Sequence, residues 1–219
     1  GESNYLSVRN IFGYQENVTT SFIPAWEYAT AYTYPTSAVT MDVASTDTVN
    51  DNGYTVRIIG LDANYNIISE DVTIPATTTK AFFRINDVLY FNTDGNQGLI
   101  TVSNGGTVYA AIRIGDGRNQ ASIYTVPAGH CFYLYRIDAF SNDSASSKTG
   151  VFKNFTINSS GHTFSVARTT FQNQMNIQRR LPFKYDEKTD IQFQLKTKSG
   201  THEMNVFGEG VLVNEGLDD

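Results

Sequence analysis

The sequence of 219 residues has few of the residue types that most often carry covalent cross-links or metal sites. One cysteine, Cys131, and three histidines exclude an internal disulfide and supply too few ligands for a closed zinc site. Charged residues make up only 17% of the chain, and acidic residues outnumber basic ones by 22 to 16. The resulting net charge of −6 is unfavourable for phosphate backbones and anionic lipids, so we expect neither nucleic acid nor a membrane as a partner.

Long apolar runs are also missing. No window approaches the roughly 18 apolar residues of a membrane-spanning helix. The first thirty residues include Glu2, Arg9, Glu16 and Glu27, at places where a secretory signal would be apolar. The sequence therefore predicts a protein that is neither membrane-bound nor exported.

Hydrophobic residues, by contrast, make up 40% of the chain, with 14 phenylalanines and 13 tyrosines, which is too much apolar material for a disordered chain. They alternate with polar residues at a period of two, and no stretch of about eleven residues or more has helical apolar spacing. Turn residues recur between the short apolar stretches. This pattern predicts an all-β fold, an antiparallel β-sandwich or jelly roll.

A turn at Val126–Gly129 separates two series of predicted strands. We predict a β-sandwich over residues 31–125 and a second β-sandwich over 126–219, with one continuous sandwich as the alternative. In the first series, Gly60–Pro75 is predicted as a hairpin with Asp62–Asn66 as its loop. The strands predicted in the second series are His130–Phe140, Val151–Ile157, His162–Phe171, Met175–Pro182, Asp190–Lys198 and Met204–Val213.

Residues 1–30 carry apolar side chains without clean alternation, which predicts an extended N-terminal arm. Such an arm wraps its own domain, docks onto a neighbouring subunit or is disordered, and its apolar content argues against disorder. Aromatic residues contribute most to binding where they are fully desolvated. The candidate interface residues are Ile11, Phe12, Tyr14, Phe22 and Trp26.

The candidates for catalysis are few. His130, His162 and His202 all lie next to turns, where an imidazole is usually solvated or caps the backbone. His130 and Cys131 are adjacent on a predicted strand, so their side chains point to opposite faces and cannot form a dyad. We therefore expect Cys131 to be a small buried hydrophobic residue.

Two pairs of acidic residues, Glu70-Asp71 and Asp186-Glu187, have the side chains that a glycosidase needs. Neighbours in sequence do not flank a bond in the way that a catalytic pair does, so we interpret them as a solvated rim. The sequence predicts no catalytic residue and no cofactor, and thus a protein that is not an enzyme.

The spacing of Asp62, Asn64 and Asn66 is similar to the start of a calcium-binding loop. The match ends there, because an EF-hand loop requires Gly at its sixth position and Glu at its twelfth, where this chain has Ile67 and Thr73. A polar hairpin turn explains the same residues, and no metal site is expected.

Several segments, taken in order, suggest a family. They are GLDANYNIISEDVTI (60–74), FFRIN (82–86), GLITV (98–102), ASIYTVPAGH (121–130) and KYDEKTDIQFQL (184–195). This series resembles structural proteins encoded by tailed bacteriophages, particularly aquatic ones, over about residues 30–210. One departure is Pro75-Ala76-Thr77, where the relatives tend to have a turn that contains glycine. The resemblance implies a place in the virus particle and no catalytic residues.

From the resemblance we expect a virion structural protein, most concretely a capsid cement or decoration protein that stabilises the shell. Its expected partners are the major capsid protein or other virion proteins and further copies of itself, as a homo-oligomer for which we expect a trimer. Its location would be the virion, assembled in the host cytoplasm. One alternative is a tail or head appendage, such as a fibre or receptor-binding protein, whose loop Asn142–Thr149 touches host glycans. Another alternative is a carbohydrate-binding or carbohydrate-processing β-sandwich module.

Overall fold

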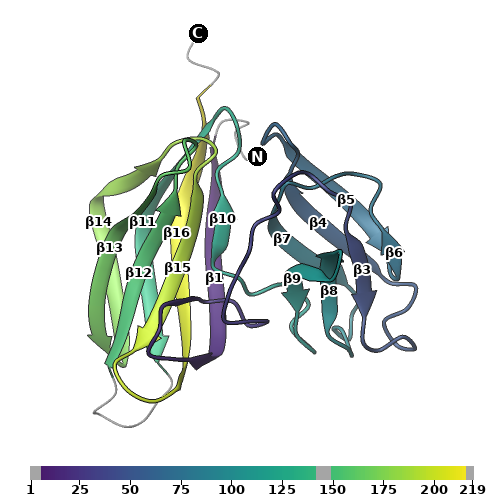
Figure 1. The fold of residues 1–219 in the computed structure, drawn as a ribbon, viewed down its shortest axis with the longest axis horizontal. Coiled ribbons are helices and arrows are strands. Elements are labelled where there is room, and N and C mark those ends of the chain that lie inside the picture. The colour runs from purple at the N-terminus through teal and green to yellow at the C-terminus, as the bar shows by residue number, and fades with distance from the viewer. Residues whose placement is uncertain (1–5, 142–148, 216–219) are drawn as a thin grey trace. The chain divides into compact units, whose positions relative to one another are not determined.

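The computed structural model describes residues 6–141 and 149–215. Over these residues the chain forms sixteen strands and no helix (Figure 1). All pairs between the strands are antiparallel, so the predicted all-β antiparallel class is confirmed. In the described part of the chain there is accordingly no apolar helix of the length needed to cross a membrane.

The chain divides into two compact units. Unit 2 is the continuous segment 32–120, whereas unit 1 combines the described parts of 1–31 and 121–219. Unit 2 is thus inserted into the chain of unit 1. The predicted division at residues 30 and 125 is corrected, because residues 6–31 and the strand at Ile123–Thr125 both belong to unit 1.

The strands of unit 1 form one hydrogen-bonded series, in the order β1-β16-β11-β14-β13-β12-β15-β10, with β2 also paired to β15. Their bounds are β1 Leu6–Val18, β2 Ile23–Pro24, β10 Ile123–Thr125, β11 His130–Ser141, β12 Thr149–Ile157, β13 Thr163–Gln172, β14 Gln174–Tyr185, β15 Asp190–Thr197 and β16 His202–Asn214. From β11 onward they match the strands predicted for the second series to within a few residues.

The series is nearly broken between β14 and β13, which pair only at Gln174 and Gln172, beside the turn at Asn173. It therefore consists of two four-stranded halves. We call β1-β16-β11-β14 half A, and β13-β12-β15-β10 with β2 half B (Figure 1).

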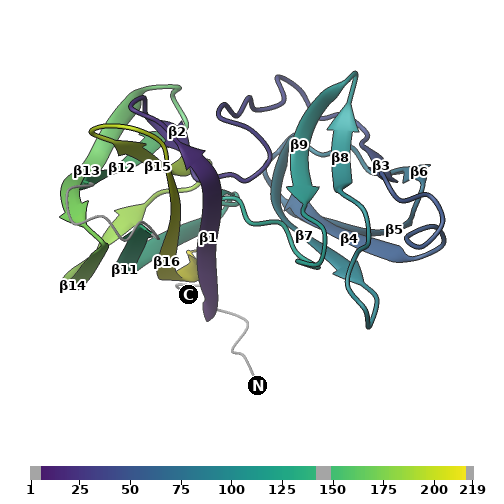
Figure 2. The ribbon, with the colours of Figure 1, turned by 90° about the horizontal axis from the view of Figure 1, so that it is seen from below.

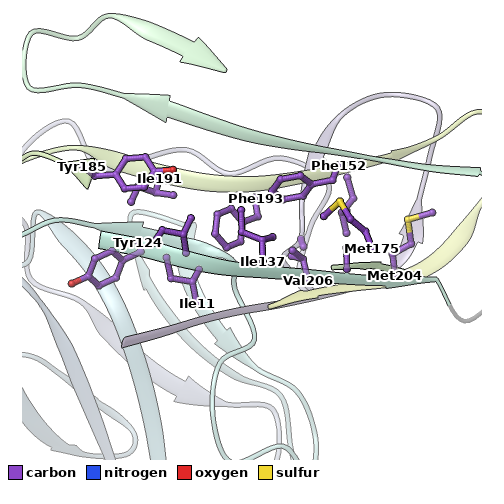
Figure 3. Close-up of a cluster of buried hydrophobic side chains, with 14 of the residues drawn as sticks. Ile11, Tyr124, Ile137, Phe152, Met175, Tyr185, Ile191, Phe193, Met204 and Val206 are labelled. Carbon is purple, nitrogen blue, oxygen red and sulfur yellow. The ribbon is translucent and has the colours of Figure 1, made fainter. Parts of the chain in front are cut away.

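The core of unit 1 lies between these halves. Half A contributes side chains such as Ile11, Ile137 and Val206, and half B contributes Phe152 and Phe193, all of them buried (Figure 3). Residues at alternate positions of each strand supply this cluster, as expected for strands with one face buried.

Two glycines of β16 allow the aromatic rings of the core to lie close to its backbone. A Cβ atom on Gly208 would lie 2.4 Å from the Phe193 ring, and one on Gly210 would lie 2.3 Å from the Phe132 ring. Both distances are far below van der Waals contact. The Gly-Glu-Gly sequence of β16 is therefore a packing requirement, since no larger residue fits beside these rings.

The expected N-terminal arm is corrected by β1. Eleven residues of this segment pair with β16, from Leu6 opposite Val213 to Val18 opposite His202. The sequence of β1 does not show a clear alternation of apolar and polar residues, because two of its inward positions are Gly13 and Gln15. Over the described residues, this segment therefore lies on its own domain, as one of the predicted alternatives proposed, and pairs there as a regular strand.

Unit 2 contains two smaller sheets that face each other across a second core. Figure 2 shows the two layers, β5-β4-β7 and β6-β3-β8-β9. Their bounds are β3 Asp42–Ser45, β4 Thr55–Leu61, β5 Ile67–Thr73, β6 Ala76–Thr77, β7 Arg84–Phe91, β8 Ile100–Asn104 and β9 Thr107–Ile112. The core includes Val56 and Ile58 from one sheet and Val43, Ile100 and Val102 from the other.

The predicted hairpin in unit 2 is confirmed. Strands β4 and β5 pair over their whole length, and residues 62–66 form the loop. Asp62 Oδ1 accepts hydrogen bonds from the backbone N–H groups of Asn64 and Asn66 at 2.8 and 2.9 Å. The carboxylate thus organises the turn itself, in the manner of an Asx turn.

Candidate interaction surfaces

The structure separates the five predicted interface residues. Ile11 and Trp26 are each 2% exposed, within unit 1. Their expected role as interface anchors is corrected, because the inward face of β1 takes Ile11 into the core and Trp26 lies buried at a bridge to Ala121. Phe12, Tyr14 and Phe22 are at least partly exposed, so their interface role remains a prediction.

Phe12 lies on the outer face of half A. Neighbouring residues of a strand point to opposite faces, so Phe12 points away from the core that contains Ile11. It is 39% exposed and lies opposite Phe207 of β16. Residues directly opposite each other share one face of the sheet, so the two rings form an outward pair.

Further apolar side chains lie on the same face, in rows that cross β1, β16 and β11. One row contains Val8, Val211 and Tyr133, and another contains Tyr14, Asn205 and Phe140. Val8 is 58% exposed and Phe140 is 40% exposed. We call this set the aromatic face: Val8, Phe12, Tyr14, Tyr133, Phe140, Phe207 and Val211.

A polar row of Asn10, Glu209 and Arg136 crosses the aromatic face between the rows of Val8 and Phe12, and Asp138 lies opposite Phe207. The charges within the face are paired with their neighbours. Arg136 forms an ion pair with Asp138 at 2.7 Å, and Asn176 donates a hydrogen bond to the same carboxylate. A hydrogen bond with Glu209 raises the pKa of the Tyr135 hydroxyl. Local pairing of these charges lowers the cost of covering the face with another protein.

Phe22 lies elsewhere, next to β2 on half B. Its ring centroid is 4.4 Å from Lys153 Nζ, 5.0 Å from Lys196 Nζ and 5.1 Å from Arg168 Cζ. We call these four residues the Phe22 cluster. Burial, and next the nearby Arg168, lower the pKa of Lys153.

Sequence reasoning did not find the cations of this cluster. The predicted strands place Lys153 and Lys196 at polar positions, but only the strand pairing, with Lys153 opposite Arg168, brings them together. That pairing joins strands whose register cannot be read from alternation alone.

The histidines and the cysteine have structural positions. His130 Nδ1 lies 2.8 Å from the carbonyl oxygen of Ala128, and His202 Nε2 lies 2.9 Å from that of Ser199. His162 is exposed beside a turn. Cys131 is fully buried, as predicted, and burial is the main cause that raises the pKa of its thiol to about 12.

The acidic pairs are also engaged locally. Asp71 forms a two-point ion pair with Arg57 at 2.7 and 2.8 Å, and Glu70 accepts hydrogen bonds from the backbone of Thr79 and Lys80. These residues line an open hollow of about 510 Å³ on the outer face of β4 and β5. Arg57 and Asp71 pair with each other, Glu70 binds backbone N–H groups, and Lys80 Nζ donates to the carbonyl oxygen of Ser69 at 2.7 Å.

In the other acidic pair, Asp186 lies 3.2 Å from Lys184 Nζ, and Glu187 accepts a hydrogen bond from the backbone of Gly129 at 2.6 Å. Across the described residues, no three His, Cys, Asp or Glu side chains come together as a metal site. The predicted loop Asn142–Thr149 lies, up to residue 148, outside the described residues.

No protein-family model and no curated protein matches the chain. Structures of infectious bursal disease virus show weak similarity. The Gx strain aligns with a TM-score of 0.28 at 11% identity, over 100% of this chain and 74% of that chain. The VP2 subviral particle gives 0.27 at 10%, over 98% and 73%, and the T=1 particles give 0.25 at 10%, over 97% and 71%. TM-scores this low support no argument about function.

Proposed function

We propose that this protein is a non-enzymatic structural component of a tailed-phage virion, where it binds the capsid as a cement or decoration protein. The observation that carries the proposal is the strand order of unit 1. Numbered along the chain, the eight main strands are arranged as 1-8-3-6 in half A and 5-4-7-2 in half B. We interpret this order as a jelly roll, an architecture used in viral capsid and lectin domains.

Fold alone does not determine function, so the surface has to support the same role. The aromatic face supports it, because Val8, Phe12 and Phe140 expose 39–58% of their area on one sheet face. Exposed apolar groups that gather in one place favour a protein interface. The series of segments that resembles phage structural proteins also supports a place in the particle.

The way in which the reactive side chains are used favours a role without catalysis. Glu70, Asp71 and Asp62 stabilise turns or pair with a neighbour, and His130 and His202 lie next to backbone carbonyls. Each of these side chains thus has a local partner within the fold. In the proposed role the partners are the major capsid protein and further copies of the chain.

Purified particles of the phage that encodes the chain test this role. Mass spectrometry should find the chain at a fixed ratio to the major capsid protein, and cross-linking should join the two. Cross-links confined to tail or fibre proteins would instead indicate an appendage and contradict the cement role. Absence from the particles would contradict both.

Substitutions on the aromatic face test the interface. Phe12→Ser combined with Phe140→Ser should weaken retention on particles that lack the native protein by about tenfold or more, because truncating a buried interface aromatic costs about 2 kcal/mol or more. The matched control is Ile67→Ser in unit 2, which is 48% exposed and lies outside this face. Co-sedimentation measures retention, and thermal unfolding confirms that the variants are folded. Equal retention of the double variant and the control would contradict the role of the face.

A further inference from the structure

The Phe22 cluster concentrates positive charge in an acidic protein. Each of its cations lies within 5.1 Å of the same ring centroid, so any two of them are at most about 10 Å apart. Their separation is thus comparable to the Debye length of about 8 Å at physiological ionic strength, and salt screens their repulsion only in part. The whole chain has a net charge of −6, so this local excess is not a consequence of composition.

The described residues provide no counter-charge for the cluster. No ion pair joins Lys153, Arg168 or Lys196 to a carboxylate among them. Other exposed cations of the chain do have such partners, for example Arg57 with Asp71 and Arg118 with Asp87. The ring of Phe22 offsets part of the repulsion, since cation–π contacts contribute about 0.5–1 kcal/mol each at exposed sites.

Three neighbouring strands carry the three cations. Lys153 of β12 lies opposite Arg168 of β13, and Lys196 lies on β15, the other neighbour of β12. The residues that alternate with them, Phe152 and Leu195, are fully buried in the core. The positive charges therefore belong to the outer face of half B.

We propose that the Phe22 cluster is a binding site for a doubly charged oxyanion group, a sulfate or a phosphate. A tetrahedral oxyanion has acceptor oxygens in several directions and can bind donors from three strands at once. Arginine suits such a group because its guanidinium donates two parallel hydrogen bonds. The bound group would supply the missing negative charge. This inference does not depend on the virion role and goes beyond it.

Calorimetric titration of the full chain with sodium sulfate and with sodium phosphate tests the proposal, against sodium chloride at the same ionic strength. We expect saturable binding at one site. Lys153→Gln and Arg168→Gln should each weaken it by about tenfold or more, because each removes a charge-assisted hydrogen bond. The control is Arg180→Gln, an exposed arginine on β14 of half A.

Two measurements keep the test independent of folding. In chloride, the variants should unfold at the same temperature as the native chain or higher, because each removes like-charge repulsion. In the native chain, sulfate should raise the pKa of Lys153, followed by NMR of its side chain, because a bound anion favours the charged amine.

A sulfated oligosaccharide distinguishes the source of the group. Binding of both free sulfate and the oligosaccharide indicates a site for the free ion, and binding of the oligosaccharide alone indicates a group carried on a polymer. The proposal is overturned if no probe binds saturably, or if Lys153→Gln and Arg168→Gln bind as tightly as Arg180→Gln.

Discussion

At the scale of single residues, Asp51 is the best example of a polar side chain on which the fold depends. It is fully buried in unit 2. Its carboxylate accepts hydrogen bonds from the hydroxyls of Ser45 at 2.5 Å and Tyr90 at 3.0 Å, and from the backbone N–H groups of Gln97 and Gly98 at 2.9 and 2.8 Å. It thereby joins segments from across unit 2.

The pKa of Asp51 reflects two opposing influences. Burial is the largest and acts to raise the pKa, but the four hydrogen bonds together outweigh it and leave the pKa below its usual value. A carboxyl group whose pKa is lowered on folding stabilises the native state above the unfolded pKa of about 3.9. That contribution is lost as the pH falls through the folded pKa.

We therefore expect Asp51→Asn to lower the free energy of unfolding of unit 2 by about 3 kcal/mol at pH 7. The new NH2 group would replace one carboxylate oxygen, so that buried donors which now bind this oxygen would lose their acceptor. The difference from the native chain should begin to shrink below about pH 4, where the unfolded carboxyl becomes protonated, and should be lost as the pH falls through the lowered pKa of the folded carboxyl. Urea unfolding at a series of pH values measures both effects. Asp94→Asn, at an exposed acid of the same unit, should change little, and a similar loss in both variants would contradict the assignment.

Gln15 shows why one residue can hide an element from sequence reasoning. It is 4% exposed, and its amide donates hydrogen bonds to the carbonyl oxygens of Trp26 at 2.7 Å and Ala29 at 3.2 Å. A buried glutamine with its hydrogen bonds made is stable, but in sequence it looks like a surface residue. With Gly13 two positions before it, the inward face of β1 carries no apolar pattern there.

At the scale of elements, most of the strands could be predicted, because alternation depends only on which side of a strand meets the core. The strands from β11 to β16 and the hairpin of β4 and β5 were all visible in this way. Their order in the sheet was not, because the pairing of β1 with β16 joins segments at opposite ends of the chain. The aromatic face depends on that pairing, and the Phe22 cluster depends on the pairing of β12 with β13 and β15, which is why both appear only in the structure.

Strand β1 leads to a prediction that separates it from a detachable arm. Deleting residues 1–18 should unfold unit 1, because it removes the buried side chains Ile11 and Val18 together with the pairing to β16. Truncating one such side chain costs about 2–5 kcal/mol, against a total stability of about 5–15 kcal/mol for a domain. Two-dimensional NMR should show that the signals of unit 2 persist while those of unit 1 collapse. A deleted protein with native unit 1 signals would restore the arm interpretation.

At the scale of the whole molecule, the chain is one unit inserted into another. All residues of the second core lie between Val39 and Ile112, within unit 2. The chain leaves and re-enters unit 1 at adjacent points, since the N–H of Ser122 donates to the carbonyl oxygen of Ala25 at 2.9 Å and Trp26 bridges Ala121. Insertion between neighbouring points of a domain is the arrangement that a host fold tolerates best.

This arrangement predicts that the units fold separately. A fragment of residues 32–120 should unfold cooperatively, because its core is complete. A second protein, in which a Gly-Ser linker of about six residues replaces 32–120, should keep the fold of unit 1, because Ala25 and Ser122, which lie close to the two ends that it joins, are hydrogen-bonded to each other. Calorimetry of each should reproduce one transition of the full chain. If either protein lacks a cooperative transition while the full chain unfolds in a single step, the two units depend on each other for stability, and the insertion is structural rather than modular.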